Sequence, residues 1–580
     1  MDTVKITLNG REYDVPKDYT ILEAAQFAGV RIPTLCFLKD VNEIGACRMC
    51  VVEVVGARAF VAACVYPVNE GMVVNTNTPA LREARKLTLE LILSNHRMDC
   101  LSCRRNLSCE LQALSREYDV DQQHFVGMED LSEQIEDSAP HLVRDNSKCI
   151  LCRRCVAVCK NNQYTGVIGV NDRGFETHVG SPFDLPLDAT SCVYCGQCIA
   201  VCPTGALTER NDTDKVWHAL ADNTKHVVIA PAPSVRAQLG ECFDYPIGTN
   251  VEGKLAAALR RMGFDGVFDV DTAADITIME EGTEFLNRLS NGGALPLITS
   301  CSPGWIKFCE HYFPDMIENL SSCKSPQQMY GALMKTYYAE KQNIDPKDMF
   351  VVTVMPCTAK KFELSRDNQN ASGYPDIDVS LTTRELADMI KKSGIIFNDL
   401  PDEEFDPAFG VASGAAHIFG ATGGVMEAAL RTVAEIVTGA PLESLDFHDV
   451  RGVEGIKEAE YNLNGTVVRV AVTSGLSNAK RLLDMVKSGE KEYHFIEVMA
   501  CPGGCVNGGG QPYQSGFTRS FTDLRAERAK ALYGEDKDMV LRKSHENPVV
   551  KEIYDTWLGE PGGHRAHETL HTTYVARKVY

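Results

Sequence analysis

The chain has 580 residues, more than one hydrophobic core usually organises, so several domains are expected. Its net charge of −21 disfavours nucleic acid and anionic membranes as partners, and the sequence predicts neither a signal peptide nor an apolar run of about 18 residues that could span a bilayer. Of the 22 cysteines, 15 crowd before residue 210, which favours metal ligation in a reducing, cytoplasmic compartment over a secreted disulfide scaffold.

The first predicted unit is a small α+β domain over residues 1–80. Apolar and polar side chains alternate on both sides of Asn9 and Gly10, which is a strong signal for a β-hairpin. Thr20 and Glu23 then form a capping-box pattern, which predicts the start of a helix that packs on this hairpin.

The second predicted unit covers residues 81–125. A helical apolar stripe over residues 81–96 should bring His96 to the second group of cysteines. The polar residues from 120 to 140 are then expected to form a connector to the next unit.

The third unit, residues 140–212, contains one cysteine spacing twice between residues 149 and 202, which indicates an internal duplication. The polar run from residue 211 to residue 214 predicts a linker. From about residue 220 to residue 580, short apolar runs alternate with helical stretches, so an α/β domain with functional loops at its strand ends is expected. The clearest runs are HVVIAPA (226–232), LPLITS (295–300), MFVVTVMPC (349–357), VVRVAVTSG (467–475) and FIEVMAC (495–501).

The first cysteine group has the spacing C-x10-C-x2-C-x13-C, formed by Cys36, Cys47, Cys50 and Cys64. Closely and distantly spaced thiolates of this kind can together hold two irons, so a 2Fe-2S cluster is favoured. The spacing differs from that of plant-type ferredoxins. A structural zinc ion is the alternative, although zinc sites usually show two tight cysteine pairs.

The second group has the pattern H-x3-C-x2-C-x5-C, formed by His96, Cys100, Cys103 and Cys109. A 4Fe-4S cluster with one histidine ligand fits this set best. A neutral imidazole in place of a thiolate leaves the cluster less negative, which should raise its reduction potential. Zinc again remains an alternative, because three cysteines with one histidine also form structural zinc sites.

The third group repeats C-x2-C-x2-C-x3-C, the pattern of bacterial two-cluster ferredoxins. In that fold the fourth cysteine of each run ligates the other cluster. One 4Fe-4S cluster is therefore assigned to Cys149, Cys152, Cys155 and Cys202, and its twin to Cys192, Cys195, Cys198 and Cys159. Together the three groups predict a series of electron-transfer clusters, which implies a redox reaction without naming it.

Three loops at the ends of apolar runs carry a family resemblance: TSCSPGW (299–305), MPCTAKKFE (355–363) and EVMACPGGCVNGGGQP (497–512). They closely resemble the three motifs of the FeFe-hydrogenases (iron-only hydrogenases), and the order of the cluster groups is similar to that of the clostridial multi-cluster form. The first two modules also resemble the large peripheral subunit of respiratory complex I. The resemblance implies a multidomain α+β and α/β fold with an N-terminal ferredoxin-like (β-grasp) domain, a His/Cys cluster module, a two-cluster ferredoxin domain and a large α/β H-cluster domain.

The resemblance also implies an H-cluster, which is a 4Fe-4S cubane joined through one cysteine sulfur to a diiron unit with CO, cyanide and azadithiolate. Cys357, Cys501 and Cys505 are then the cubane ligands, with Cys505 as the bridge. Lys360 is expected to hold one cyanide by a hydrogen bond, although a surface lysine is the plain reading. Further residues match the cyanide-contacting segment or the diiron pocket of the family, and most of these read as ordinary core without the resemblance: Ala232, Pro233, Ser234, Gln327, Met355, Phe419 and Met499.

One departure from the family lies in the first loop. The usual loop has two adjacent cysteines, the first relaying protons and the second binding the cubane, whereas this chain has Cys301 followed by Ser302. Transfer by position makes Cys301 the proton donor and Ser302 the ligand. A serine alkoxide matches cubane iron poorly, so a shift that makes Cys301 the ligand and a serine hydroxyl the proton carrier is the alternative.

The rest of the proton route transfers by resemblance to Glu281, Ser321, Glu284 and Arg288. Glu281 and Glu284 are three residues apart, so one helical turn should put both carboxylates on the same side. Their acidic surroundings alone would favour a solvated helix end. Cys242, Cys309 and Cys323 belong to no motif and are expected to be buried free thiols.

The resulting hypothesis is the reversible interconversion of H2 with two protons and two electrons, after assembly of the site by maturation proteins. The expected electron partners are a ferredoxin or, with some preference, NAD(P)-linked flavin and iron-sulfur subunits of an electron-bifurcating complex. Two alternatives are a non-catalytic electron-transfer subunit of the complex I type and an H2-sensing homologue. The cysteine loops at 357 and 501–505 argue against the first, and the altered residue Ser302 favours the second.

Overall fold

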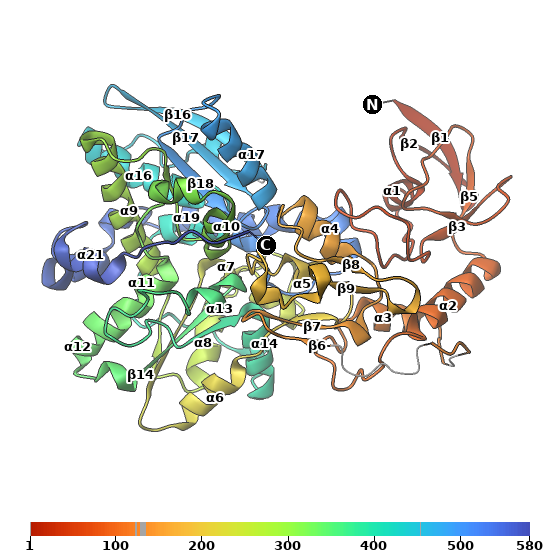
Figure 1. The fold of residues 1–580 in the computed structure, drawn as a ribbon, viewed down its shortest axis with the longest axis horizontal. Coiled ribbons are helices and arrows are strands. Elements are labelled where there is room, and N and C mark those ends of the chain that lie inside the picture. Colours follow the sequence, from red (N-terminus) through yellow and green to blue (C-terminus); the bar gives the residue numbers. More distant parts are fainter. Residues whose placement is uncertain (1, 122–123, 128–134, 453, 580) are drawn as a thin grey trace.

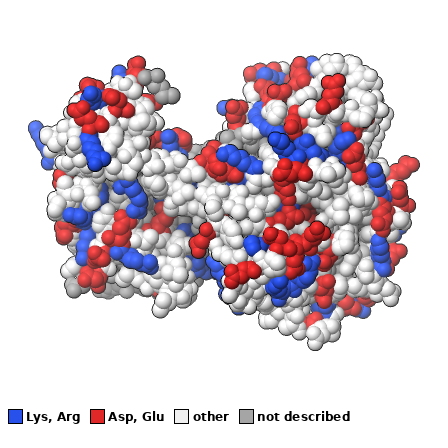
Figure 2. Space-filling model, turned by 180° about the vertical axis from the view of Figure 1, so that it is seen from behind, with Lys and Arg blue, Asp and Glu red and all other residues white. Residues whose placement is uncertain are grey.

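The computed structural model describes residues 2–121, 124–127, 135–452 and 454–579. The described chain forms a small N-terminal lobe and a large C-terminal lobe, with the two-cluster ferredoxin unit between them (Figure 1). Part of the connector expected between residues 120 and 140 lies outside the described residues. On the face drawn in Figure 2, acidic and basic side chains are interspersed over both lobes. None of the helices described is both long enough and apolar enough to cross a membrane.

The N-terminal domain confirms the predicted hairpin and helix. β1 (Thr3–Leu8) and β2 (Arg11–Pro16) pair antiparallel, and Asn9 and Gly10 between them have φ of 49° and 80°, as a tight hairpin turn requires. α1 (Ile21–Phe27) starts at the predicted capping box, in which the Thr20 side chain accepts from the Glu23 backbone. Three more strands complete the sheet in the order β2-β1-β5-β3-β4: β3 (Val51–Val54), β4 (Val61–Ala62) and β5 (Val73–Asn75).

The second unit is built on two helices. α2 (Pro79–Leu93) begins two residues before the predicted stripe, because Thr78 caps it and Pro79 occupies its first turn. It ends three residues before His96, which lies in the following turn. α3 (Glu110–Glu117) starts directly after Cys109.

The ferredoxin unit is a pair of short helices on small sheets. α4 (Arg154–Asn161) and α5 (Gln197–Val201) each begin one residue before the third cysteine of one repeat, and they pack against each other. The strands are β6 (Ile135–Glu136), β7 (Leu142–Asp145), β8 (Gly169–Asn171), β9 (His178–Gly180) and β10 (Leu207–Glu209). The predicted linker is shorter than expected, because α6 (Thr213–Ala221) already begins at Thr213, where Asn211 accepts a hydrogen bond from the Thr213 backbone.

The C-terminal domain contains two four-stranded sheets, and each of the five predicted apolar runs forms a strand in one of them. The first sheet is parallel, in the order β12-β11-β14-β15, and the second has the order β13-β18-β17-β16 with only β16 and β17 antiparallel. The strands are β11 (His226–Pro231), β12 (Gly266–Val267), β13 (Leu297–Ile298), β14 (Met349–Met355), β15 (Val379–Thr382), β16 (Ile456–Leu463), β17 (Thr466–Ser474) and β18 (Phe495–Met499). The carboxyl ends of parallel strands are where α/β domains usually bind their ligands.

Helices pack around these sheets and between them (Figure 1). The long helix α9 (Asp271–Asn291) contacts α11 (Pro326–Leu333) and α16 (Gly424–Thr438), and the last residues of the chain run back toward the ferredoxin unit. The remaining α-helices are α7 (Pro233–Arg236), α8 (Glu252–Arg261), α10 (Pro303–Tyr312), α12 (Ala339–Gln342), α13 (Ala359–Glu363), α14 (Thr383–Lys392), α15 (Gly414–His417), α17 (Leu476–Lys487), α18 (Gly516–Phe521), α19 (Leu524–Asp538), α20 (Pro548–Ile553) and α21 (His564–Leu570).

Candidate active site and metal-cluster sites

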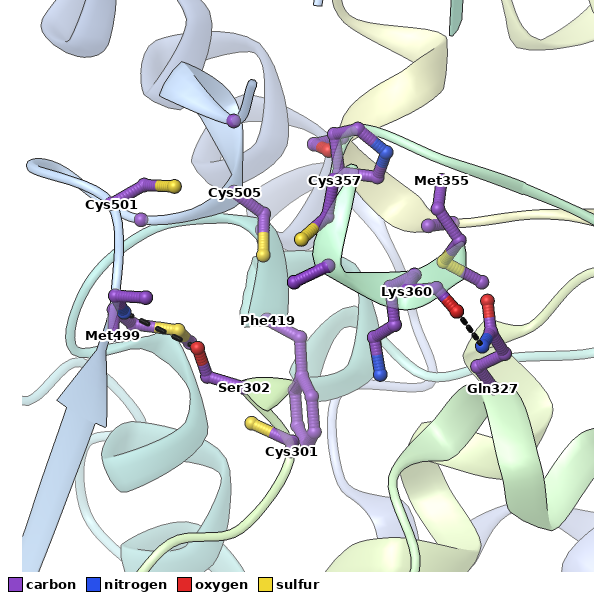
Figure 3. Close-up of a pocket in the computed structure, with 18 of the residues that line it drawn as sticks. Cys301, Ser302, Gln327, Met355, Cys357, Lys360, Phe419, Met499, Cys501 and Cys505 are labelled. Atoms are coloured by element: carbon purple, nitrogen blue, oxygen red, sulfur yellow. Dashed lines mark hydrogen bonds between the residues drawn. The ribbon is translucent and has the colours of Figure 1, made fainter. Parts of the chain in front are cut away.

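A cavity of about 80 Å³ lies where the loops after β11, β13, β14 and β18 meet. All the residues predicted from the second and third motifs as ligands or wall residues line it, together with those predicted from the segment at 232–234 (Figure 3). The predicted residues that the cavity brings together are Ala232, Pro233, Ser234, Cys301, Ser302, Gln327, Met355, Cys357, Lys360, Phe419, Met499, Cys501 and Cys505. Segments more than 250 residues apart in the sequence therefore converge on one site.

The three predicted cubane cysteines sit in tight loops on one side of this cavity. Cys357 follows β14, whereas Cys501 and Cys505 follow β18 (Figure 3). Burial raises the pKa of all three thiols, that of Cys505 to about 12, so the iron-free thiols are neutral at pH 7 and give up their protons on binding metal. Gly504 has a φ of 95°, and a Cβ there would lie 2.7 Å from the Thr422 nitrogen. Only glycine allows this close approach of the loop.

Cys301 and Ser302 enter the cavity from the loop between β13 and α10. In Figure 3, Ser302 lies beside Met499, on the side of Cys501, whereas Cys301 lies beside Phe419. The Ser302 hydroxyl oxygen accepts a hydrogen bond from the Ala500 backbone at 3.2 Å. Burial, and then the nearby Glu281 carboxyl, raise the pKa of the Cys301 thiol well above its usual value. Cys301 therefore carries its proton at neutral pH.

Lys360 lies at the opposite wall and takes part in a buried polar network. Its ammonium donates to both oxygens of Glu363, at 3.0 and 3.3 Å. Gln327 donates to the same carboxylate at 3.1 Å, and its own carbonyl oxygen accepts from the hydroxyls of Thr353 and Ser380, at 3.0 Å each. Glu363 belongs to the second motif, but its contact with Lys360 was not predicted. Its position three residues after Lys360 on a helix could have indicated this contact.

The four residues of the predicted proton route follow one another from the cavity toward the surface. Glu281 is buried behind Cys301, and burial raises the pKa of its carboxyl to about 8. The Ser321 hydroxyl donates to Glu284 at 2.9 Å, and Arg288 donates to the other oxygen of Glu284 at 2.6 Å. Glu281 and Glu284 thus share one side of α9, and the Arg288 side chain is 15% exposed.

Two smaller cavities in the ferredoxin unit each collect four cysteines. One, of about 20 Å³, is lined by Cys149, Cys152, Cys155 and Cys202. The other, of about 30 Å³, is lined by Cys159, Cys192, Cys195 and Cys198. The repeats thus exchange their fourth cysteines, as the assignment by spacing requires. Cys195 also lines the main cavity, a contact that the sequence did not reveal.

In the two N-terminal cluster sites, some predicted ligand atoms lie close together or lack a hydrogen-bond partner among the described residues. The Cys50 and Cys64 sulfurs are 3.3 Å apart, and the Cys47 backbone donates to the Cys36 sulfur. His96 is buried, and its Nδ1 has no hydrogen-bond partner among the described residues. A buried nitrogen without a partner is costly, so this imidazole fits the role of a metal ligand beside Cys100, Cys103 and Cys109.

Family models match successive parts of the chain in the predicted order. The C-terminal domain of the iron-only hydrogenase large subunit matches residues 225–509, and the iron hydrogenase small subunit matches residues 522–577. Upstream, a 2Fe-2S iron-sulfur cluster binding domain matches residues 1–79, the iron-sulfur binding region of NADH-ubiquinone oxidoreductase G matches 85–124, and a 4Fe-4S dicluster domain matches 148–206. The multidomain fold with iron-sulfur domains that the sequence predicted is confirmed.

Two curated relatives match over nearly the full chain. The NADP-reducing hydrogenase subunit HndD of Solidesulfovibrio fructosivorans is 48% identical over all of both chains, and iron hydrogenase 1 of Clostridium pasteurianum is 45% identical over 98% of this chain and 99% of its own. The structure of apo FeFe-hydrogenase HydA1 from Chlamydomonas reinhardtii is 45% identical and covers 63% of this chain and 99% of its own, with a TM-score of 0.56. The chain therefore belongs to the iron-only (FeFe) hydrogenases, which are oxidoreductases acting on hydrogen.

Proposed function

We propose that this hydrogenase interconverts H2 with two protons and two electrons in the cavity lined by Cys301, Lys360 and the three predicted cubane cysteines. The observation that carries the proposal is the convergence of these groups in one buried, mostly apolar space. The thiols fit an iron cluster by donor chemistry, because soft thiolates suit iron. The glycine-rich loop that carries Cys501 and Cys505 leaves room for a bulky inorganic group.

The group that fits is an H-cluster. When bound, its cubane and its diiron unit with CO, cyanide and azadithiolate supply the redox centre at which H2 is split and formed. In this proposal Cys357, Cys501 and Cys505 hold the cubane, with Cys505 shared with the diiron unit. The Lys360 ammonium and the segment from Ala232 to Ser234 hold the cyanides by hydrogen bonds. The side chains of Gln327, Met355, Phe419 and Met499 exclude water and fix the orientation of the group.

Protons are moved by the chain's own residues. Cys301 carries its proton at neutral pH and faces Glu281, so it exchanges protons between the cavity and that carboxyl. From Glu281, the Ser321 hydroxyl passes the proton to Glu284, and Arg288 holds Glu284 in place at the outer end. Because Cys301 serves the proton route in this proposal, Ser302, which lies beside Met499 on the side of Cys501, is the proposed fourth ligand of the cubane.

The role of Ser302 is tested by replacing it with cysteine. If the Ser302 oxygen is a cubane ligand, a thiolate in its place changes the electron density on the cluster, so the infrared bands of CO and cyanide in the matured Ser302→Cys variant should shift. Unshifted bands, together with loss of all bands in Cys301→Ala, would instead make Cys301 the ligand.

Electrons are proposed to travel through one 2Fe-2S cluster and three accessory 4Fe-4S clusters. Cys195 lines both the second ferredoxin cavity and the main cavity, so the cluster at Cys192, Cys195, Cys198 and Cys159 is the one next to the active site. The histidine-ligated cluster at His96 should have a higher reduction potential than its all-cysteine neighbours.

For the electron partner, we propose NAD(P)-linked flavin and iron-sulfur subunits of a multi-subunit, electron-bifurcating complex. The end-to-end match to a subunit of an NADP-reducing hydrogenase and the complex I type of the second module support this partner. A ferredoxin is the second candidate. Maturation proteins must supply the diiron unit, because no side chain provides CO or cyanide.

The proposed site is tested on protein matured by hydrogenase maturation proteins. Infrared spectra should show bands of iron-bound CO and cyanide, and the protein should evolve H2 with reduced methyl viologen. Replacing Cys505 by alanine should abolish both signals, while accessory iron is retained. Matured wild-type protein without such bands, with iron sufficient only for the accessory clusters, would contradict the proposal.

A further inference from the structure

The last residues of the chain lie against the outer end of the proton route. The Thr572 backbone donates to the Ser322 carbonyl oxygen, and the Lys324 backbone donates to that of Leu570, at 2.8 Å each. These two bonds form a bridge between the segments on either side of Cys323 and His571. The bridge thereby fixes the His571 side chain beside residues that follow Ser321, the third member of the route.

His571 is held by a hydrogen bond at each ring nitrogen. Its Nδ1 lies 2.8 Å from the Ser322 hydroxyl, and its Nε2 lies 3.0 Å from a carboxylate oxygen of Glu280. Glu280 is fully buried and also accepts from the Tyr554 hydroxyl and from the Gly562 backbone. The imidazole therefore has a fixed orientation, set by groups that do not belong to the predicted route.

His571 is also close to Glu284. The Cys323 thiol donates to Glu284 at 3.7 Å, and one ligand-type atom each of Glu284, Cys323 and His571 lie within 4.8 Å of one another. The Ser322 backbone donates to the same carboxylate at 3.1 Å. Among the described residues, the charged and titratable groups that face His571 or its partners are Glu280, Glu281, Glu284 and Arg288 on α9, Cys323 on the bridged segment, Tyr554 in the π-helical turn after α20, His567 on α21, and Tyr574.

This group lies close to the surface. Only 5% of the His571 side chain is exposed, but its ring stacks on that of the exposed residue His567, with centroids 4.6 Å apart and an angle of 8° between the planes. Its partner Ser322 is half-buried. Imidazole is the side chain whose ordinary pKa lies closest to neutrality, so it can take up and release a proton at the pH of the cell.

We propose that His571 is a second outlet of the proton route, which exchanges protons between Glu284 and solvent in parallel with the outlet at Arg288. The proposal rests on the proposed role of Glu284. During H2 oxidation, a proton leaves the Glu284 carboxyl and one proton arrives on His571 by way of the Cys323 thiol, which lies within 4.8 Å of both groups and gives up one proton as it accepts another. His571 then passes a proton to the half-buried Ser322 hydroxyl, which releases its own proton to water, and during H2 evolution the transfers run in reverse. Every bond to hydrogen that breaks along the relay is replaced by a new one, and no electron is transferred.

The experiment compares variants of the matured, full-length enzyme in H2 oxidation at saturating acceptor and low buffer concentration. His571→Gln keeps an amide that can hydrogen-bond to Ser322 and Glu280 but cannot titrate, so we expect kcat to fall about tenfold with an unchanged KM for H2. Added imidazole should restore kcat in His571→Ala, since it can occupy the space of the missing ring.

The matched control is His564→Ala. It removes a histidine at the start of the preceding helix α21, whose side chain is 88% exposed, and it should leave kcat and the imidazole response unchanged. Infrared bands of iron-bound CO and cyanide in each variant show that the active site is loaded. Because His571 acts through Glu284, the double variant with Glu284→Gln should be no slower than Glu284→Gln alone.

The outcomes separate this inference from the proposed route. A slow Glu284→Gln variant with wild-type rates in both His571 variants would overturn the second outlet and leave the route intact. A loss of kcat in the His571 variants that imidazole does not restore would assign His571 a structural role and also overturn it. A Glu284→Gln variant as fast as the wild type would remove the route on which the outlet depends.

Discussion

Replacing Cys301 by alanine is expected to lower H2 evolution by about 10³-fold, within the range that a positioned acid or base contributes, while the infrared bands of the active-site iron remain. The Cys301 thiol is protonated at neutral pH, borders the main cavity and faces the buried Glu281. No other thiol joins the cavity to that carboxyl among the described residues. The measurement is H2 evolution with reduced methyl viologen, together with infrared spectra of the same samples.

Cys309→Ala is the matched control, because Cys309 is a buried thiol on the neighbouring helix α10 whose sulfur contacts the Phe313 carbonyl oxygen instead of the cavity. It should keep near wild-type turnover. Full activity in Cys301→Ala would remove the thiol from the proton route.

Replacing Glu281 by glutamine should lower kcat by about 10²- to 10⁴-fold in both directions of the reaction. The amide retains the shape of the side chain but cannot accept and release a proton. Because Glu281 has no exposed outlet and lies between Cys301 and Ser321, its loss interrupts the route at its most buried point. Turnover of H2 evolution and of H2 oxidation is the quantity to compare.

The pH dependence of the wild type follows from the same carboxyl. Burial raises the pKa of Glu281 to about 8, so the group is a neutral acid below this pH and a carboxylate above it. H2 evolution needs the protonated form and should fall as the pH rises through about 8. The raised pKa also makes the folded state more stable below the ordinary carboxyl pKa, and this contribution is lost as the pH rises toward 8.

Glu318→Gln serves as the control. Glu318 is exposed near Arg288, and its backbone carbonyl oxygen, not its side chain, accepts a hydrogen bond from that residue. It should change neither kcat nor the pH profile. A Glu281→Gln variant that keeps wild-type turnover and the same fall near pH 8 would contradict the assignment.

Local patterns predicted much of the fold. The hairpin at Asn9 and Gly10 and the helix capped by Thr20 depend on interactions between residues a few positions apart, so they are visible in the sequence. The five apolar runs were recognisable for the same reason. The division of the C-terminal strands into two sheets was not, because it depends on pairings such as that of β13 with β18, about 200 residues later in the chain.

The candidate site likewise contains residues that could be predicted from the sequence and residues that could not. Cysteine spacing predicted which cysteines share each cavity of the ferredoxin unit, because ligands of one cluster often come from one loop. The residues of the main cavity come from distant segments and were predicted through the family resemblance. The contacts of His571 with Ser322 and Glu280 join positions about 250 to 290 residues apart, and no motif marks them. The sequence also left Cys301 and Ser302 as alternatives for the fourth cubane ligand. Their different neighbours in the cavity support the proposal that Ser302 takes this position, which the Ser302→Cys variant tests.

The contact between the ferredoxin unit and the loop after Cys505 has a further consequence. A Cβ at Gly509 would lie 2.4 Å from the Cys195 carbonyl oxygen and 2.6 Å from Gly196, so the two backbones touch without any side chain between them. Electron tunnelling weakens steeply with each ångström of separation. A bulkier residue at position 509 would push apart the loops that hold the two proposed clusters, so we expect it to slow electron transfer between the ferredoxin unit and the catalytic domain.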